Sequence, residues 1–421
     1  MANLTPSNTL WSRRRLFYDG ARIAIGASLA AVPSLVQAYA TWQYLPPTWN
    51  IGWNAALTNA VTTPCWIAVI GDSIAQGLVA TNFMTSSWFA LLRWMLLQHS
   101  PLFADFYTPA HSGAYIRTTG ISYHQQLPWS FRPSIPVKFT VQGYGRVPML
   151  EGTVLRTFAT YTSPYPCSGL DIIWANRFGV ADATWSFAID SATPQTVTTP
   201  PLGIYPYRLS IYGLEPQRSH TIAFSNQSAT AAWNVWGVAS YSGHSGGIGF
   251  ALLASAGDSV QTWNPSKQEP LGREFLLAGP SYIGNTGFGF PVGPNLAIIA
   301  LSANDALLGT PIQAYRDGLI AFIQAVRLNL PTASIALLAM NIPTTDLDLA
   351  SPFQGIASHY PPYLGAMQTV ARRYNCAFLN FHAKWGPNSI ANGLVTSNGH
   401  PTDLGHQDIA TSLYNALGTP R

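Results

Sequence analysis

The chain has 421 residues, enough for more than one domain, and 48% of them are hydrophobic while only 9% are charged. This composition excludes a disordered chain. The formal net charge of +4 comes from scattered ions, with no basic run between residues 60 and 421, so we expect no nucleic-acid partner. Cys65, Cys167 and Cys376 lie far apart, which excludes a disulfide framework or a zinc site and allows at most one disulfide.

The first 50 residues support two interpretations. Residues 12–17 (SRRRLF) resemble a twin-arginine export motif, an apolar run covers residues 23–36, and residues 38–40 have the form of a cleavage site. Charged residues beside the run and a proline within it argue against a signal peptide. The alternative is an arm over residues 1–50 that docks on virion or cell-surface partners. Either way we expect an extracellular or virion-associated protein, exported or part of a phage particle.

An uncharged run of apolar and β-branched residues at 66–70 predicts a buried strand of a parallel sheet. Gly71-Asp72-Ser73 follows it directly. A serine in the first turn after such a strand lies at the carboxyl edge of the sheet, where open α/β folds bind ligands. Ser73 is therefore a candidate nucleophile. Asp and Ser are also preferred helix N-caps, so the tripeptide alone leaves both interpretations open.

Residues 131–241 have a different character. Short runs of β-branched and aromatic residues are broken by Pro, Gly, Asn and Ser, which predicts an all-β sandwich, jelly-roll-like in type. The runs cover residues 137–141, 153–161, 171–175, 185–189, 207–212 and 220–224. The tryptophans and tyrosines of this block suit a sugar-binding face, although core packing is the ordinary role of each.

Strand–helix alternation returns from about residue 285. We expect strands at 295–301, 334–340 and 377–381, and helices at 312–329, 363–374 and 408–417. With the strand at 66–70 and a helix at 87–99, these elements predict a parallel sheet covered by helices on both faces. The β-rich block is then an insertion. The predicted organisation is an arm over 1–50, an α/β domain over 51–130 and 242–421, and an inserted sandwich over 131–241.

Two further turns bring reactive side chains to the ends of predicted elements. Asn304 follows the strand at 295–301, and His400 and His406 lie in the segment GHPTDLGH of residues 399–406. A serine, a side-chain amide and a histidine at one sheet edge are the parts that acyl transfer needs, because the histidine removes the serine proton and the amide helps to stabilise the oxyanion. We expect Asp72 and Asp305 to brace their turns. No metal or organic cofactor is expected.

Three blocks in this order resemble those of the SGNH, or GDSL, hydrolase family. They are Gly71-Asp72-Ser73, Ser302-Ala303-Asn304-Asp305 in place of the family's G-x-N-D, and the segment from His400 to His406. The resemblance implies a flavodoxin-like three-layer α/β hydrolase domain. The inserted β-sandwich is similar to that of a subgroup of the family, in which some members are phage proteins.

The resemblance also implies roles for single residues. Ser73 is the expected nucleophile, and His400, which precedes a proline, is the expected base. The oxyanion hole would consist of Ser73, Gly243 and Asn304. Gly243 is the better match to the family's second block, and Gly113 is a weaker one.

One departure from the family concerns the acid of the triad. The family usually has Asp three residues before the histidine, where this chain has Ser397. Ser397 or a carbonyl group could orient His400, another acid could substitute, or Asp403 and His406 could be the working pair. Losing the orienting acid can cost about ten-thousandfold in rate. A weak or vestigial site on a glycan-binding or virion structural protein is therefore the alternative function.

A competing nucleophile is Ser245, in a G-x-S-x-G match to the nucleophile elbow of α/β-hydrolases. A strand-like stretch at 233–240 precedes it and a helix-like stretch at 248–254 follows, which is the required context. This alternative lacks an HGGG-type oxyanion loop and leaves Ser73 and Asn304 without roles. The function expected from the sequence is thus a serine esterase that O-deacetylates a polysaccharide or cell-wall glycan.

Overall fold

The computed structural model describes most of the chain between residues 41 and 418, all of it within one compact unit over residues 39–421. The described ranges are 41–63, 65–98, 103–107, 129–131, 138–140, 149–152, 157–176, 184–198, 207–227, 233–242, 247–254, 257–263, 294–342 and 359–418. The export motif and the rest of residues 1–40 lie outside them. No helix in the described ranges is long and apolar enough to cross a membrane.

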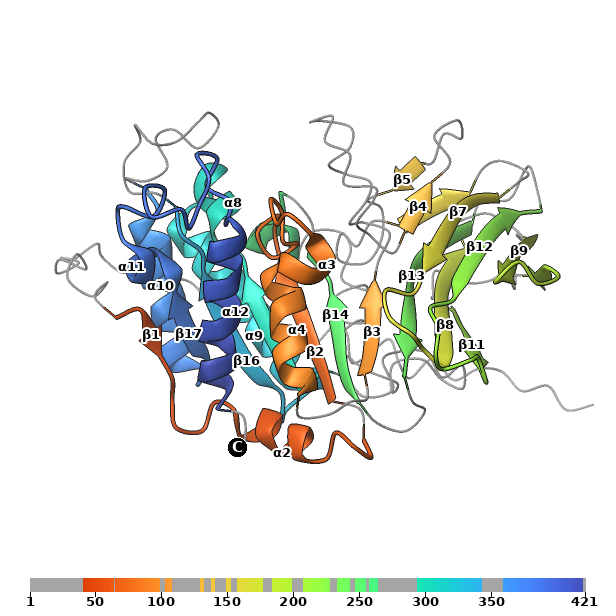
Figure 1. Ribbon diagram of the computed structural model, residues 1–421. Coiled ribbons are helices and arrows are strands. Elements are labelled where there is room, and N and C mark those ends of the chain that lie inside the picture. Colours follow the sequence, from red (N-terminus) through yellow and green to blue (C-terminus); the bar gives the residue numbers. More distant parts are fainter. Residues whose placement is uncertain are drawn as a thin grey trace, which may run out of the picture. The chain divides into compact units, whose positions relative to one another are not determined.

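Five parallel strands form the centre of the hydrolase-like part (Figure 1). Their spatial order is β14 (Ile248–Leu252), β2 (Cys65–Gly71), β15 (Leu296–Ala300), β16 (Ser334–Ala339) and β17 (Ala377–Asn380). In chain order this is 2-1-3-4-5, the flavodoxin-like arrangement, whose strand order reverses between β2 and β15. All residues of these strands are buried, as their uncharged sequences predict.

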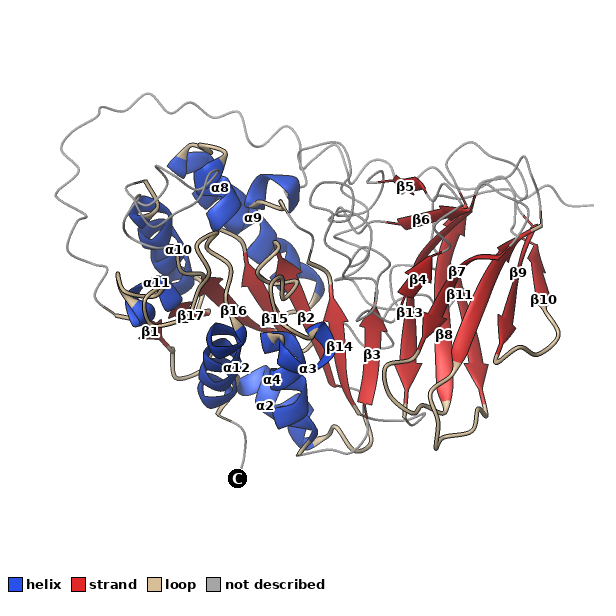
Figure 2. Ribbon diagram, turned by 45° about the horizontal axis from the view of Figure 1, so that its top comes forward, coloured by secondary structure: helices blue, strands red, loops and turns tan. Residues whose placement is uncertain are grey.

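Helices cover both faces of this sheet (Figure 2). Residues of α4 (Trp88–Leu97) and α12 (Asp403–Leu417) join one apolar cluster with one face of the strands. Residues of α9 (Ile312–Asn329) and α10 (Pro361–Arg373) join a second cluster with the other face. The predicted three-layer α/β fold is therefore confirmed. Shorter helices are α2 (Ile51–Thr58), α3 (Phe83–Ser86), η5 (Val260–Trp263), α8 (Ala303–Leu307) and α11 (Phe381–Trp385).

Between α4 and β14 the described chain forms mostly antiparallel strands, although residues 103–107 pair parallel with β14. One sheet has the order β10 (Gln195–Thr198), β9 (Thr184–Ile189), β12 (Thr221–Asn226), β7 (Thr157–Thr162) and β4 (Trp129–Phe131). The other strands extend the central sheet: β3 (Phe103–Tyr107), β13 (Trp233–Tyr241), β6 (Met149–Gly152), β5 (Lys138–Thr140), β8 (Gly169–Asn176) and β11 (Tyr207–Tyr212). These antiparallel sheets agree with the predicted β insertion.

Strand β13 belongs to both parts. It pairs antiparallel with β3, which itself runs parallel to β14, and it also pairs antiparallel with β8. The insertion is thus hydrogen-bonded into the same sheet as the hydrolase-like strands, and the domain boundaries drawn from the sequence stay a prediction. Trp174 and Trp185 are buried with their ring centroids 5.5 Å apart, so these two aromatic residues pack as core.

Three local expectations need correction or comment. The stretch 248–254, expected to be helical, contains strand β14. Helix α12 begins at Asp403, five residues before the expected start at 408, with Thr402 as its N-cap. Within the predicted arm, β1 (Gln43–Tyr44) pairs antiparallel with β17 at the edge of the sheet. Cys65, Cys167 and Cys376 are all buried free thiols.

Candidate active site

The turn after β2 carries the candidate nucleophile. A Cβ at Gly71 would lie 2.4 Å from the Cβ of Ala75 and 2.8 Å from the carbonyl oxygen of Ala300, so only glycine allows β2 to end this close to β15. Asp72 is buried, and its Oδ1 accepts a 2.9 Å hydrogen bond from the backbone N–H of Ile74. Asp72 therefore braces the turn, as expected, and Ser73 lies at its outer edge.

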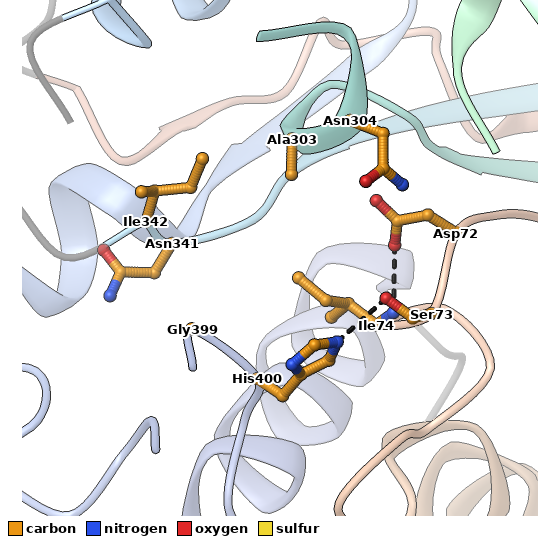
Figure 3. Close-up of a pocket in the computed structure, with 9 residues that line it drawn as sticks. All are labelled: Asp72, Ser73, Ile74, Ala303, Asn304, Asn341, Ile342, Gly399 and His400. Atoms are coloured by element: carbon orange, nitrogen blue, oxygen red, sulfur yellow. Dashed lines mark hydrogen bonds between the residues drawn. The ribbon is translucent and has the colours of Figure 1, made fainter. Parts of the chain in front are cut away.

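Ser73 and His400 are 327 positions apart in the sequence but lie in contact in the structure. Their Oγ and Nε2 atoms are 2.9 Å apart (Figure 3). His400 lies in the loop before α12, directly after Gly399, which has a φ of +80°. The hydroxyl and the imidazole are therefore within the range for proton transfer.

The alternative histidine is placed differently. His406 lies in α12, fully buried, with its Nε2 3.3 Å from the carbonyl oxygen of Leu78. Asp403 accepts a 2.8 Å hydrogen bond from the backbone N–H of Thr81. The structure thus brings His400 to Ser73 and gives Asp403 and His406 contacts that stabilise the chain after the Ser73 turn.

The ring of His400 is oriented by a residue that the sequence interpretation missed. Its Nδ1 lies 3.1 Å from Oδ1 of Asn398, and its backbone nitrogen lies 3.3 Å from the same oxygen. Thr396 Oγ1 also hydrogen-bonds to this oxygen. The neighbouring Ser397, one of the alternatives that the sequence left open for this role, is exposed. The only signal in the sequence is a carbonyl-bearing side chain two residues before the histidine.

Burial sets the charge of the site. It lowers the pKa of His400 to about 4, so the imidazole is neutral at pH 7 and Nε2 or Nδ1 can accept a proton. Burial also raises the pKa of Asp72 to about 7 and that of Asp305 to about 6. Asp305 Oδ2 accepts a 2.8 Å hydrogen bond from the backbone N–H of Val260, which ties α8 to η5 in the structural role expected for it.

Asn304 lies in α8, directly beyond β15, and shares a small cavity with Ser73 and His400 (Figure 3). Its Nδ2 donates a 2.9 Å hydrogen bond to the carbonyl oxygen of Asp258. An amide nitrogen carries two hydrogens, so this contact orients the group while the second hydrogen can serve a ligand. The cavity measures about 10 Å³ and is lined by Asp72, Ser73, Ile74, Ala303, Asn304, Asn341, Ile342, Gly399 and His400.

Gly243 and Ser245, like Gly113, lie outside the described residues, but the chain on either side of residues 243–246 is described. Gly247 donates to the carbonyl of Ala60 at 2.6 Å and accepts from the N–H of Cys65 at 2.9 Å, so it lies at the amino end of β2. Ser73 follows the carboxyl end, about 20 Å away for a strand of this length. In addition, the strand β14 follows Ser245 where an elbow needs a helix.

The carboxyl end of β14 leads to a different glycine. Gly257 is exposed with a φ of +84°, and the next residue, Asp258, is the one whose carbonyl holds the Asn304 amide. Gly257 thus follows the second parallel strand on the same edge as Ser73. The sequence interpretation did not single out Gly257.

The geometry and the fold resemble those of SGNH-type serine ester hydrolases. Residues 228–407 match the model of the GDSL-like Lipase/Acylhydrolase family. The match takes in Asn304 and His400, whereas Ser73 lies upstream of it because the β insertion follows β2. No curated protein matches the sequence.

Solved structures show the same fold. A peptidoglycan O-acetylesterase is similar over 88% of this chain and 95% of its own, with a TM-score of 0.61 and 16% identity. A family 2 carbohydrate esterase with a carbohydrate-binding domain from Corynascus thermopiles (Myceliophthora fergusii) matches at 14% identity and a TM-score of 0.30, over 64% of this chain and 94% of its own. At these identities and scores, only the first likeness carries an argument, and it concerns the fold.

Proposed function

We propose that this protein is a serine esterase that removes O-acetyl groups from a polysaccharide or cell-wall glycan through an acyl-enzyme. The observation that carries the proposal is the 2.9 Å contact between Ser73 Oγ and Nε2 of a buried, neutral His400. A serine hydroxyl is a weak nucleophile until an adjacent base takes its proton. This pair supplies both groups at the reversal of strand order, where sheets of this topology bind ligands.

In the proposed mechanism, His400 Nε2 takes the Ser73 proton while Oγ attacks the carbonyl carbon of the ester. The backbone N–H groups of Ser73 and of Gly257, which we place here instead of Gly243, and the Asn304 amide stabilise the oxyanion. The imidazolium then gives its proton to the departing sugar oxygen, and acetyl-Ser73 forms. Water, deprotonated by His400, hydrolyses this ester and releases acetate. Each oxyanion donor of this kind contributes about 3–4 kcal/mol in other enzymes.

The size of the cavity supports a small acyl group. The space open to the centre of a water-sized sphere is only about 10 Å³. Ile74, Ala303 and Ile342 supply apolar walls. For the glycan part of the substrate, the support is the likeness to a peptidoglycan O-acetylesterase and the β insertion, which is typical of carbohydrate-binding modules.

Acetate release from O-acetylated peptidoglycan and acetylated xylan tests the proposal. We expect release by the full chain and a loss of at least about a thousandfold in Ser73→Ala, because the nucleophile is gone. Ser245→Ala is the matched control and should keep the wild-type rate. Full activity in Ser73→Ala would contradict the assignment. Tight glycan binding without any acetate release would instead support the binding-protein alternative.

A further inference from the structure

We propose that Asn398 is the positioning residue of this site, whose amide oxygen holds His400 in the tautomer that accepts the Ser73 proton. The proposal rests on the proposed function of the Ser73–His400 pair. It assigns to a neutral side chain the place that a carboxylate occupies in a Ser-His-Asp triad. The Asn398 amide oxygen would then provide the orientation that the acid provides in such a triad.

The tautomer follows from hydrogen-bond chemistry. Oδ1 of an asparagine can only accept, so His400 Nδ1, 3.1 Å away, carries the hydrogen. In a neutral imidazole the other nitrogen is then an acceptor. Nε2 therefore presents its lone pair to the Ser73 hydroxyl at 2.9 Å. With the hydrogen on Nε2 instead, the ring could not take the serine proton.

The orientation of the Asn398 amide is fixed by its neighbours. The backbone N–H of His400 lies 3.3 Å from Oδ1, and a backbone N–H can only donate. If the amide were reversed, its NH2 group would face this donor. Thr396 adds a hydroxyl contact to the same oxygen, and its backbone N–H donates to the His400 carbonyl at 2.8 Å. The loop from 396 to 400 is thus closed on itself with the oxygen toward the ring.

The difference from an aspartate is charge. The Asn398 amide oxygen and the backbone hydrogen bond with Asn398 favour the imidazolium that forms during the reaction less than a carboxylate would. The titratable groups packed around His400 are Asp72 on the Ser73 turn and Asp403 and His406 of α12. Burial dominates and lowers the pKa of His400 to about 4. Because the base works when neutral, activity should persist down to this pH and fall only as the pH drops through it.

The first experiment measures kcat and KM for acetate release from a soluble acetyl ester between pH 3.5 and 8. Asn398→Ala should lower kcat about 10- to 1,000-fold with little change in KM, because the ring loses its orientation. Asn398→Asp should shift the acid limb of the kcat/KM profile to higher pH by at least about one unit, because a carboxylate beside an imidazole raises its pKa. Asn392→Ala, an exposed asparagine of the same loop, should change neither.

Several outcomes would overturn the proposal. The proposal fails if the acid limb of kcat/KM does not move in Asn398→Asp, or if folded Asn398→Ala keeps the wild-type kcat. In either case an inactive Ser73→Ala would leave the proposed function intact. A loss of kcat in Ser397→Ala without a loss in Asn398→Ala would assign the positioning role to Ser397 instead. Conversely, full activity in Ser73→Ala refutes the proposed function whatever Asn398 does.

A second measurement does not depend on activity. Long-range ¹H–¹⁵N NMR spectra distinguish the two neutral tautomers of a histidine, and His400→Gln identifies the signal of His400. We expect the hydrogen on Nδ1 in the wild-type protein at pH 7 and a mixture of tautomers in Asn398→Ala. A hydrogen on Nε2 in the wild type would overturn the proposal even if the protein hydrolyses no ester.

Discussion

His400 meets Ser73 as a neutral imidazole because water is largely excluded from the ring. The same exclusion raises the pKa of Asp72, one residue from the nucleophile, to about 7. Asp72 is therefore only partly ionised at neutral pH, in a chain that has few charged residues at all. In such an environment each hydrogen bond to a developing oxyanion is worth more than it would be in water.

At the residue scale, we expect the walls of the cavity to select the acyl group of the substrate. Ile342→Ala removes three carbons from one wall, so we expect the ratio of kcat/KM for butyrate over acetate esters to rise about tenfold, in line with about 1–3 kcal/mol per methylene. The measurement uses matched p-nitrophenyl esters. Ile335→Ala, a buried isoleucine of β16 outside the cavity, should leave the ratio unchanged. An unaltered ratio in Ile342→Ala would show that the cavity does not hold the acyl chain.

At the scale of elements, the site depends on two strands that are distant in sequence and adjacent in space. β2 and β15 pair in parallel up to Gly71 and Ala300, so the Ser73 turn and α8 begin side by side. The loop before α12 then brings His400 to the same edge. Most of these elements could be predicted from sequence pattern, and α9 has the predicted bounds of 312–329.

The failures have physical reasons. The stretch 248–254 is a short apolar run, and periodicity cannot distinguish a buried strand from a helix at this length. Asn398 was missed because the backbone after it, with Gly399 at a φ of +80°, decides which side chain faces the ring. No spacing rule encodes that choice.

The close approach of β2 and β15 makes Gly71 sensitive to substitution. Gly71→Ala places a Cβ 2.4 Å from the Cβ of Ala75 and 2.8 Å from the Ala300 carbonyl, so we expect a loss of about 1–3 kcal/mol in the free energy of unfolding. Ala75→Gly in the same chain removes only the first clash and should restore part of the loss. Thermal and denaturant unfolding of the wild type and these two variants measure the changes in the free energy of unfolding. Wild-type stability in Gly71→Ala would contradict the close approach of the strands.

At the scale of the whole molecule, the hydrolase fold is assembled from two stretches of chain separated by the β insertion. The family match begins at residue 228 and includes His400, the proposed base, while Ser73, the proposed nucleophile, precedes the insertion. Sequence order alone left two serines in competition, Ser73 before the insertion and Ser245 after it. Sheet topology separates them, because the described neighbours of Ser245 lie at the amino edge and Ser73 lies with His400 at the carboxyl edge.

The central claim, that His400 activates Ser73, is tested most directly by covalent capture on the full-length chain. A fluorophosphonate reacts with serines that an adjacent base activates, and peptide mass spectrometry locates the adduct. We predict one adduct per chain, on Ser73, and its loss in folded His400→Ala. An adduct on Ser245, or labelling of Ser73 that persists at the same rate in His400→Ala, would contradict the account.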